Sequence, residues 1–199
     1  STTSVWAEIG EGLQVLKQVP SVRGAMLHLV LLYSLLAALY VLALQLAALI
    51  ESLGPSGFGA LLAMSGVGMA IGAVVIAQAG HRFSRRRLSA TGLGTITWTL
   101  VLLSQLRGSL MFTLSLCGIL GVGAALVAIP AQTTIQEETP ESERGRVFGL
   151  QNNLINIALS LPLVLAGTLV SSIGLQPVLL LLAGLALTAA LIERPWQRC

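Results

Sequence analysis

Hydrogen-bonding side chains at helical spacing form the first group of candidate functional residues. Asn152, Asn156 and Ser160 follow one another at intervals of four residues, so they share one face of a helix. Amides and hydroxyls within an apolar helix avoid lipid and face either a neighbouring helix or a water-filled cavity. We expect them to line a polar pathway together with four residues of other apolar runs, Tyr33, Tyr40, Gln132 and Thr133. The alternative is that these amides only form packing hydrogen bonds between helices.

Opposite charges in two loops form the second group. An acidic stretch and a basic stretch lie at the same end of the predicted helices, where ion pairs between them can close a bundle and must break when it opens. Each pair at a wet surface contributes about 0 to 1 kcal/mol, but several together bias a two-state equilibrium. The alternative is that the arginines only orient the chain and the glutamates only solvate a loop. The candidate gate residues are Arg82, Arg85, Arg86, Glu137, Glu138, Arg144 and Arg146.

Covalent and metal chemistry is not indicated. The two histidines and two cysteines lie far apart in the sequence, so we expect no metal site. Ser56 lies in a Gly-Pro-Ser-Gly turn before an apolar run, but His81, the nearest base, is one full span away, about 30 Å. A nucleophile needs its base within hydrogen-bond reach. The sequence therefore predicts a protein that is not an enzyme and uses no cofactor.

The composition is that of an integral membrane protein. Hydrophobic residues make up 55% of the 199 residues and charged residues only 10%, against roughly a quarter in soluble domains. Mean hydropathy is +0.87, and the apolar runs approach the roughly 20 residues that a membrane span needs. The net charge of +3 is explained by orientation in a membrane, so we expect no binding of nucleic acid.

Six spans account for the apolar runs. Their approximate bounds are 24–50, 58–79, 88–106, 110–134, 147–171 and 175–192. Drawn in this way, ten of the eleven basic residues fall on one side of the membrane, and only Arg107 falls on the other. Because basic residues near span ends stay in the cytoplasm, this pattern predicts that both termini are cytoplasmic. No acidic or basic residue lies well inside a span, which argues against a proton relay within this chain.

Two segments follow from this pattern. Residues 1–19 contain an amphipathic helix, with Trp6, Ile9, Leu13 and Leu16 at helical spacing, which we expect to lie at the membrane interface. Residues 20–199 form the six-helix membrane bundle. Gly68 and Gly72 in the second span form a small-xxx-small pair, which predicts close approach of another helix.

The loop between the second and third spans resembles a family signature. It reads AQAGHRFSRRR over residues 77–87. This is similar to the loop of the major facilitator superfamily, in which Gly, three residues, Asp-Arg, any residue, Gly and two basic residues join the second and third helices of each six-helix half. Three residues match its basic positions, Arg82, Arg85 and Arg86. Ala77, His81 and Ser84 depart from it, and such degeneracy is typical of the C-terminal half.

The loop before the fifth span strengthens the resemblance. It reads QEETPESERGRVFG over residues 136–149, with a Gln-Glu end, a proline and an Arg-Gly-Arg sequence before the next helix. This looks like the loop between helices ten and eleven of drug-efflux members of the same superfamily. The resemblance extends to residues 1–19, which are similar to the end of the central cytoplasmic linker.

The resemblance implies a fold and a function. The chain would be the C-terminal half of a twelve-helix transporter in the inner (plasma) membrane, rocking against its N-terminal half or a second copy around a site near the midplane. Apolar walls imply a small amphipathic or hydrophobic substrate, exported by alternating access. The alternatives are a lysophospholipid flippase of the same superfamily and a scaffold subunit that does not transport.

Overall fold

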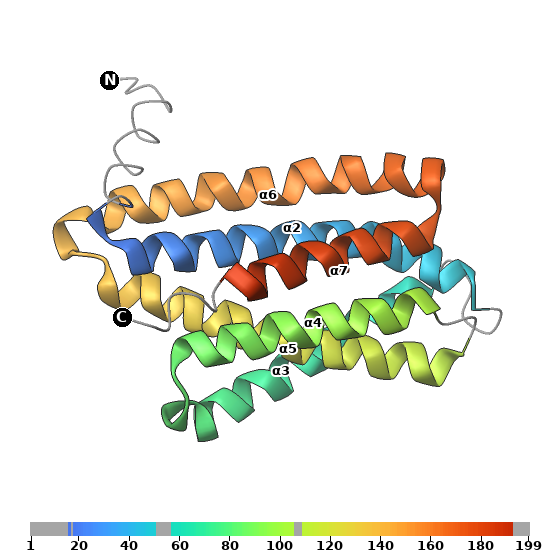
Figure 1. The fold of residues 1–199 in the computed structure, drawn as a ribbon, viewed down its shortest axis with the longest axis horizontal. Coiled ribbons are helices and arrows are strands. Elements are labelled where there is room, and N and C mark those ends of the chain that lie inside the picture. The colour runs from blue at the N-terminus through green and yellow to red at the C-terminus, as the bar shows by residue number, and fades with distance from the viewer. Residues whose placement is uncertain (1–15, 17, 51–56, 106–108, 193–199) are drawn as a thin grey trace.

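The structure, a computed structural model, is a bundle of long helices (Figure 1) and describes residue 16 and residues 18–50, 57–105 and 109–192. The long helices are α2 (Pro20–Ala48), α3 (Phe58–Ala79), α4 (Arg85–Gln105), α5 (Leu110–Glu138), α6 (Arg144–Ile173) and α7 (Leu175–Ile192). Two short 3-10 helices, η2 (Gly80–Arg82) and η3 (Glu141–Glu143), precede α4 and α6. Most of residues 1–19 and the turn with Arg107 lie outside the described residues, so the predictions for them stay predictions.

The apolar runs predict the ends of some helices better than those of others. α3 and α7 begin and end where the apolar runs do, whereas the other four helices extend into polar sequence. α2 begins at Pro20 because proline has no N–H to leave unpaired and its fixed φ suits the first turn. α4 begins with three arginines and α5 ends with two glutamates, all of them good helix formers. In these four helices, the structure therefore adds polar residues at one or both ends of the predicted apolar run.

Five helices within the described ranges are long and apolar enough to cross a membrane: α2, α3, α5, α6 and α7. α4 is not among them because arginines occupy its first turn and threonines and serines interrupt its apolar run. Thr95, Thr97 and Thr99 each donate a hydrogen bond to a carbonyl four residues earlier, at 2.7 to 2.9 Å. Hydroxyls satisfied within their own helix lose much of their polar character. A sixth span at α4 stays a prediction.

The core lies between α2, α4, α5 and α7. Buried leucines of all four helices meet there, among them Leu35, Leu100, Leu120 and Leu179. α3 packs on the outer side of α5, and α6 packs on α2, so that these two form opposite edges of the bundle (Figure 1). Only 17% of the apolar window of each edge helix is buried, against 44% for α5. The edge helices therefore present most of their surface to whatever surrounds the chain.

Glycines allow α3 to lie directly against the backbone of α5. A Cβ on Gly68 would overlap the carbonyl oxygen of Gly118, and a Cβ on Gly72 would lie 2.7 Å from that of Ala125. From the other side, a Cβ on Gly121 would overlap the carbonyl oxygen of Ser65. The close approach predicted from Gly68 and Gly72 is confirmed. Such contacts matter in lipid, where van der Waals packing takes the place of the hydrophobic effect between helices.

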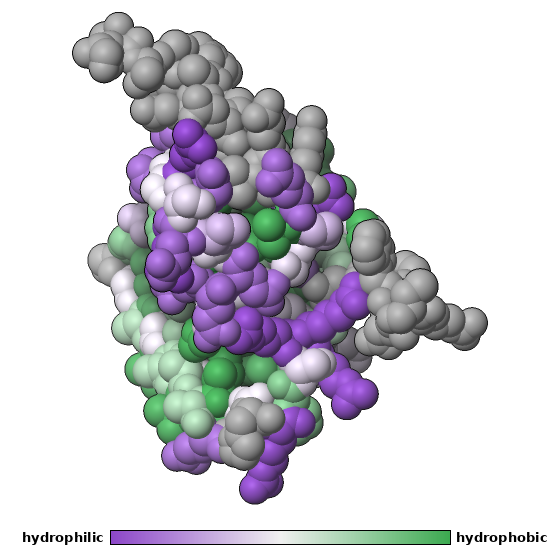
Figure 2. Space-filling model, turned by 90° about the vertical axis from the view of Figure 1, so that its left-hand side faces the viewer, coloured by the Kyte–Doolittle hydropathy of each residue, from purple (hydrophilic) through white to green (hydrophobic). Residues whose placement is uncertain are grey.

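All charged residues in the described ranges lie at one end of the bundle. α2, α4 and α6 begin at this end, and α3, α5 and α7 end there (Figure 1). Figure 2 looks onto it and shows hydrophilic side chains gathered across the face, with apolar surface below them. We call it the arginine-rich end. It brings together the two loops whose charges form the predicted gate.

Candidate functional site

The three residues spaced by four on α6 share its exposed face. Asn152, Asn156 and Ser160 are all exposed, whereas Gln151 and Ala158 on the opposite side are buried. Ser160 donates its hydroxyl hydrogen to the carbonyl oxygen of Asn156 at 2.8 Å. The helix continues through Pro162 beyond this stripe. The side chains of Asn152 and Asn156 therefore form no hydrogen bond with the described residues, and they lie on the outer side of the bundle edge.

Tyr33, Tyr40 and Thr133 make their described contacts with residues outside that stripe. Tyr33 is half-buried and packs against the apolar cluster that joins α2, α5 and the start of α6. Tyr40 is 45% exposed and contacts Phe58 of α3 edge-on, with ring centroids 6.0 Å apart. Thr133 donates its hydroxyl hydrogen to the carbonyl oxygen of Ile129 at 2.8 Å within α5. The fold thus places the two tyrosines against different neighbours, although they share one face of α2.

Gln132 meets a partner that the sequence did not single out. The side-chain nitrogen of Gln151 donates to the side-chain oxygen of Gln132 at 2.7 Å and links α6 to α5. Gln151 is 8% exposed, and its own side-chain oxygen has no hydrogen-bond partner. A buried acceptor without a donor is costly, particularly in a low-dielectric interior. The sequence signal was a second amide in an apolar run, but which face of the helix packs inward is known only from the structure.

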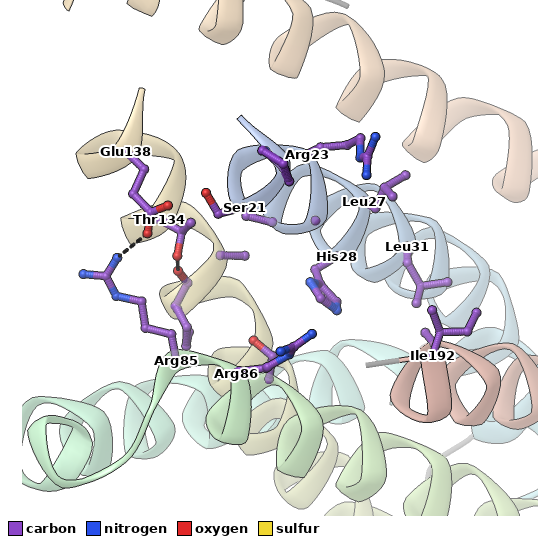
Figure 3. A pocket seen from close by; sticks show the side chains of 17 residues that line it. Ser21, Arg23, Leu27, His28, Leu31, Arg85, Arg86, Thr134, Glu138 and Ile192 are labelled. Carbon is purple, nitrogen blue, oxygen red and sulfur yellow. Dashed lines mark hydrogen bonds and ion pairs between the residues drawn. The ribbon is translucent and has the colours of Figure 1, made fainter. Parts of the chain in front are cut away.

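The charged loops meet through one arginine. Arg85, in the first turn of α4, pairs with Glu137 and lies 3.7 Å from Glu138 on the last turn of α5 (Figure 3 shows the contact with Glu138). These side chains are 42 to 59% exposed, so the pairs are solvated and weak. The structure brings these three candidates together. Arg85 occupies the position at which the loop signature has its first basic residue after the inner glycine.

The other gate candidates do not join the two loops through ion pairs described here. Arg144 lies 3.5 Å from Glu141, and Arg146 bonds Glu143 at 2.9 Å, so these pairs span only three residues. Arg82 is exposed and forms no ion pair with the described residues. Arg86 points into a pocket beside α2 (Figure 3).

Ser84 caps the N-terminus of α4. It stands where the family signature has its inner glycine, directly before α4. Its hydroxyl oxygen accepts a hydrogen bond from the backbone N–H of Arg87 at 3.3 Å. This is the geometry of an N-cap, in which a side chain satisfies one of the free N–H groups of the first turn. The sequence signal, a serine just before a helical run, was present.

Comparison with known proteins assigns these elements to a family. A sequence model described as Major Facilitator Superfamily matches residues 26–195, which cover most of α2, all of α3 to α7 and both charged loops. No curated protein matches the chain. The match therefore supports the resemblance of the loops without specifying a substrate.

Proposed function

Because this chain belongs to the major facilitator superfamily, a family of membrane transporters, we propose that it is a six-helix half of a transporter that exports small amphipathic or hydrophobic compounds. Its transport mechanism would be alternating access, in which two such halves rock against one another around a site near the membrane midplane. The partner would be an N-terminal half or a second copy. The arginine-rich end would lie on the cytoplasmic side of the inner membrane.

The observation that carries the proposal is the polar outer stripe of α6. Asn152, Asn156 and Ser160 lie on the exposed side of an edge helix that is long and apolar enough to span a bilayer. Amides that face lipid lose hydrogen bonds to water and gain none in return. A second six-helix body, or a wet cavity between two bodies, would supply the missing partners.

The proposed substrate class follows from the side chains that the six helices present, which would form one wall of the transport site. Away from the arginine-rich end, the described helices contain no acidic or basic side chain and present amides, hydroxyls, tyrosine rings and apolar surface. An anionic substrate near the midplane would require a buried cation, which costs several kcal/mol to place there, about 2.5 to 3.5 on insertion scales. Neutral amphiphiles fit such a wall better, and its tyrosine rings can attract a lipophilic cation.

The gate proposal changes with the position of Arg85. Its partners Glu137 and Glu138 belong to the same six-helix bundle, so the pair joins α4 to α5 within one half. Rocking of two halves needs each half to move as a unit. We therefore assign the pair a bracing role at the cytoplasmic mouth, which keeps the two loops together as the halves separate.

Transport in reconstituted vesicles tests the proposal. The protein with its partner half is placed in proteoliposomes, and efflux of a fluorescent lipophilic cation and movement of a labelled lysophospholipid are followed in parallel. Export of the cation alone supports the proposal. Movement of the lysolipid alone favours the flippase, and movement of neither, in protein shown to be folded, favours the scaffold.

Labelling of single cysteines tests the environment of the stripe. In a background with Cys117→Ala and Cys199→Ala, Asn156→Cys is compared with Val164→Cys, which is on the same helix where the side chain is 67% exposed and apolar. A hydrophilic thiol reagent should modify Asn156→Cys at least about tenfold faster in the assembled protein, since thiolates form only where water reaches. Equal, slow labelling of both positions would show that water does not reach the stripe and would contradict a substrate pathway there.

A further inference from the structure

We propose that a pocket at the arginine-rich end binds the phosphate headgroup of an anionic membrane lipid. The pocket has a volume of about 730 Å³ and lies between the first turns of α2 and α4 and the last turns of α5 and α7. This size is within the range of small-molecule sites. It lies among the helices of one bundle, so it exists in this chain without a partner half.

The polar lining of the pocket is cationic. Arg23, Arg85 and Arg86 line it with a single acidic residue, Glu138. Figure 3 shows that Arg85 turns toward Glu138, whereas Arg86 of α4 and His28 of α2 point into the space between these two helices. An arginine offers five N–H donors in a planar fork, so Arg86 can hold another contact and still bind a phosphate. The excess of positive charge selects an anion.

Ser89 adds an observation that itself indicates a ligand. The residue is 5% exposed, lines the pocket one helical turn beyond Arg86, and makes no side-chain hydrogen bond with the described residues. The threonines further along the same helix all bond a carbonyl of the preceding turn. Its hydroxyl is therefore able to donate a hydrogen bond to water or to a ligand in the pocket. A phosphate oxygen held by Arg86 would accept its hydrogen.

The apolar part of the pocket points to a lipid as the source of that phosphate. Leu27, Leu31 and Ile192 form one wall, and Leu27 and Ile192 are 63% and 69% exposed at its rim. Along α2, the lining residues from Ser21 to Leu31 cover about 15 Å at 1.5 Å per residue. That depth joins the headgroup level to the hydrocarbon, as an amphiphile does. A soluble phosphate compound would leave the apolar wall unused.

The inference depends on the placement of the chain in a membrane and is independent of transport. Loss of lipid binding and loss of substrate export can therefore be measured apart. Lipid bound here would fill the space between α2 and α4, next to Arg85 and Glu138, which also line the pocket.

The test compares lipids on the purified protein in detergent. Retention of dioleoylphosphatidylglycerol and dioleoylphosphatidylcholine is measured by native mass spectrometry, and stabilisation by each is measured by thermal unfolding. Both lipids carry an anionic phosphate that arginine can bind, but the choline group of phosphatidylcholine adds a positive charge that the arginines repel. We therefore expect the anionic lipid to bind about tenfold more tightly. Equal affinity for the two lipids would overturn the proposal.

A matched pair of variants separates the site from general charge. Arg86→Gln should weaken binding of phosphatidylglycerol about tenfold, whereas Arg87→Gln should change it less than twofold, because the exposed neighbour Arg87 does not line the pocket. Equal losses in the two variants would show non-specific attraction and overturn the site. Inorganic phosphate is the third arm: if it stabilises the protein as strongly as the lipid and depends equally on Arg86, the lipid assignment is overturned.

A second variant keeps the proposal testable if Arg86→Gln does not fold. The double substitution His28→Asn with Ser89→Ala changes no arginine and makes no residue larger. We expect it to weaken binding of phosphatidylglycerol about fivefold through lost hydrogen bonds. Unchanged binding in this folded variant would overturn the proposal.

Discussion

The edge helices α3 and α6 are equally poorly covered by their own bundle but differ in chemistry. The exposed face of α3 is apolar along its membrane span, with Val67, Ile71 and Val74 about half exposed. The exposed side of α6 carries two asparagines and a serine beside exposed apolar residues such as Ile157. A lipid-facing helix can look like α3 throughout, whereas the first half of α6 needs a polar or protein neighbour. One edge is suited to lipid and the other to a partner.

The two helices are also attached differently. α3 meets α5 backbone to backbone at glycines, with no side-chain hydrogen bond between them in the described residues. α6 is attached by apolar packing on α2 and by the amide pair of Gln151 and Gln132. The difference shows that close packing alone can hold an edge helix where its outer face is apolar.

The largest effect is expected where the backbones touch. In Gly68→Ala the new Cβ would overlap the carbonyl oxygen of Gly118, so α3 must move away from α5. We expect a loss of about 3 kcal/mol in the free energy of unfolding, the upper range for overpacking. Thermal or denaturant unfolding in detergent measures it. Gly66→Ala is the control, since a Cβ there meets nothing within 4 Å. Equal stability of the two variants would contradict the close approach.

The next effect concerns the outer stripe of α6. Asn156→Leu removes an exposed amide without touching the core of the bundle. We expect transport to fall about tenfold, because an interhelical hydrogen bond in a membrane contributes about 1 to 2 kcal/mol in model systems. The unfolding temperature of the chain itself should stay the same. Val164→Leu on the same helix should leave transport within twofold. A similar loss in both variants would contradict a special role of the polar stripe.

The amide pair should give a smaller effect. Gln132→Leu, Gln151→Leu and the double variant form a thermodynamic cycle for the 2.7 Å hydrogen bond between α5 and α6. Couplings of this kind in membrane proteins average about 0.6 kcal/mol, so we expect a value near that. The double variant should be more stable than the sum of the single losses predicts, since it leaves no amide unpaired. A coupling of zero would mean that apolar packing alone attaches α6.

The smallest effect is expected from the charged brace. Arg85→Gln should lower the free energy of unfolding by at most about 1 kcal/mol, because both partners are solvated. At 1 M salt the difference from the unsubstituted protein should vanish, since the screening length falls to about 3 Å. Arg87→Gln, which removes no ion pair among the described residues, serves as the matched control. A salt-independent loss would show that Arg85 acts by packing.

Several features were predictable from sequence because they follow from local pattern. The apolar runs located all six helices, and Gly68 with Gly72 indicated a close contact, although not with which helix. Among the residues predicted to form a gate, Glu137 and Glu138 meet Arg85, while Arg144 and Arg146 pair with nearby glutamates. Sequence reasoning cannot choose among four arginines on one loop, because long flexible side chains reach similar distances. Their role in gating stays a prediction.

The sequence by itself determined the helices, the membrane environment that their composition requires, and the gathering of charge at one end, because each depends on residue type and short-range spacing. Only the tertiary structure decided that Asn152 and Asn156 face outward, that Gln151 meets Gln132, and that α2, α4, α5 and α7 enclose a cationic pocket. The physical reason is that periodicity defines the faces of a helix, whereas packing against other helices decides which face is covered.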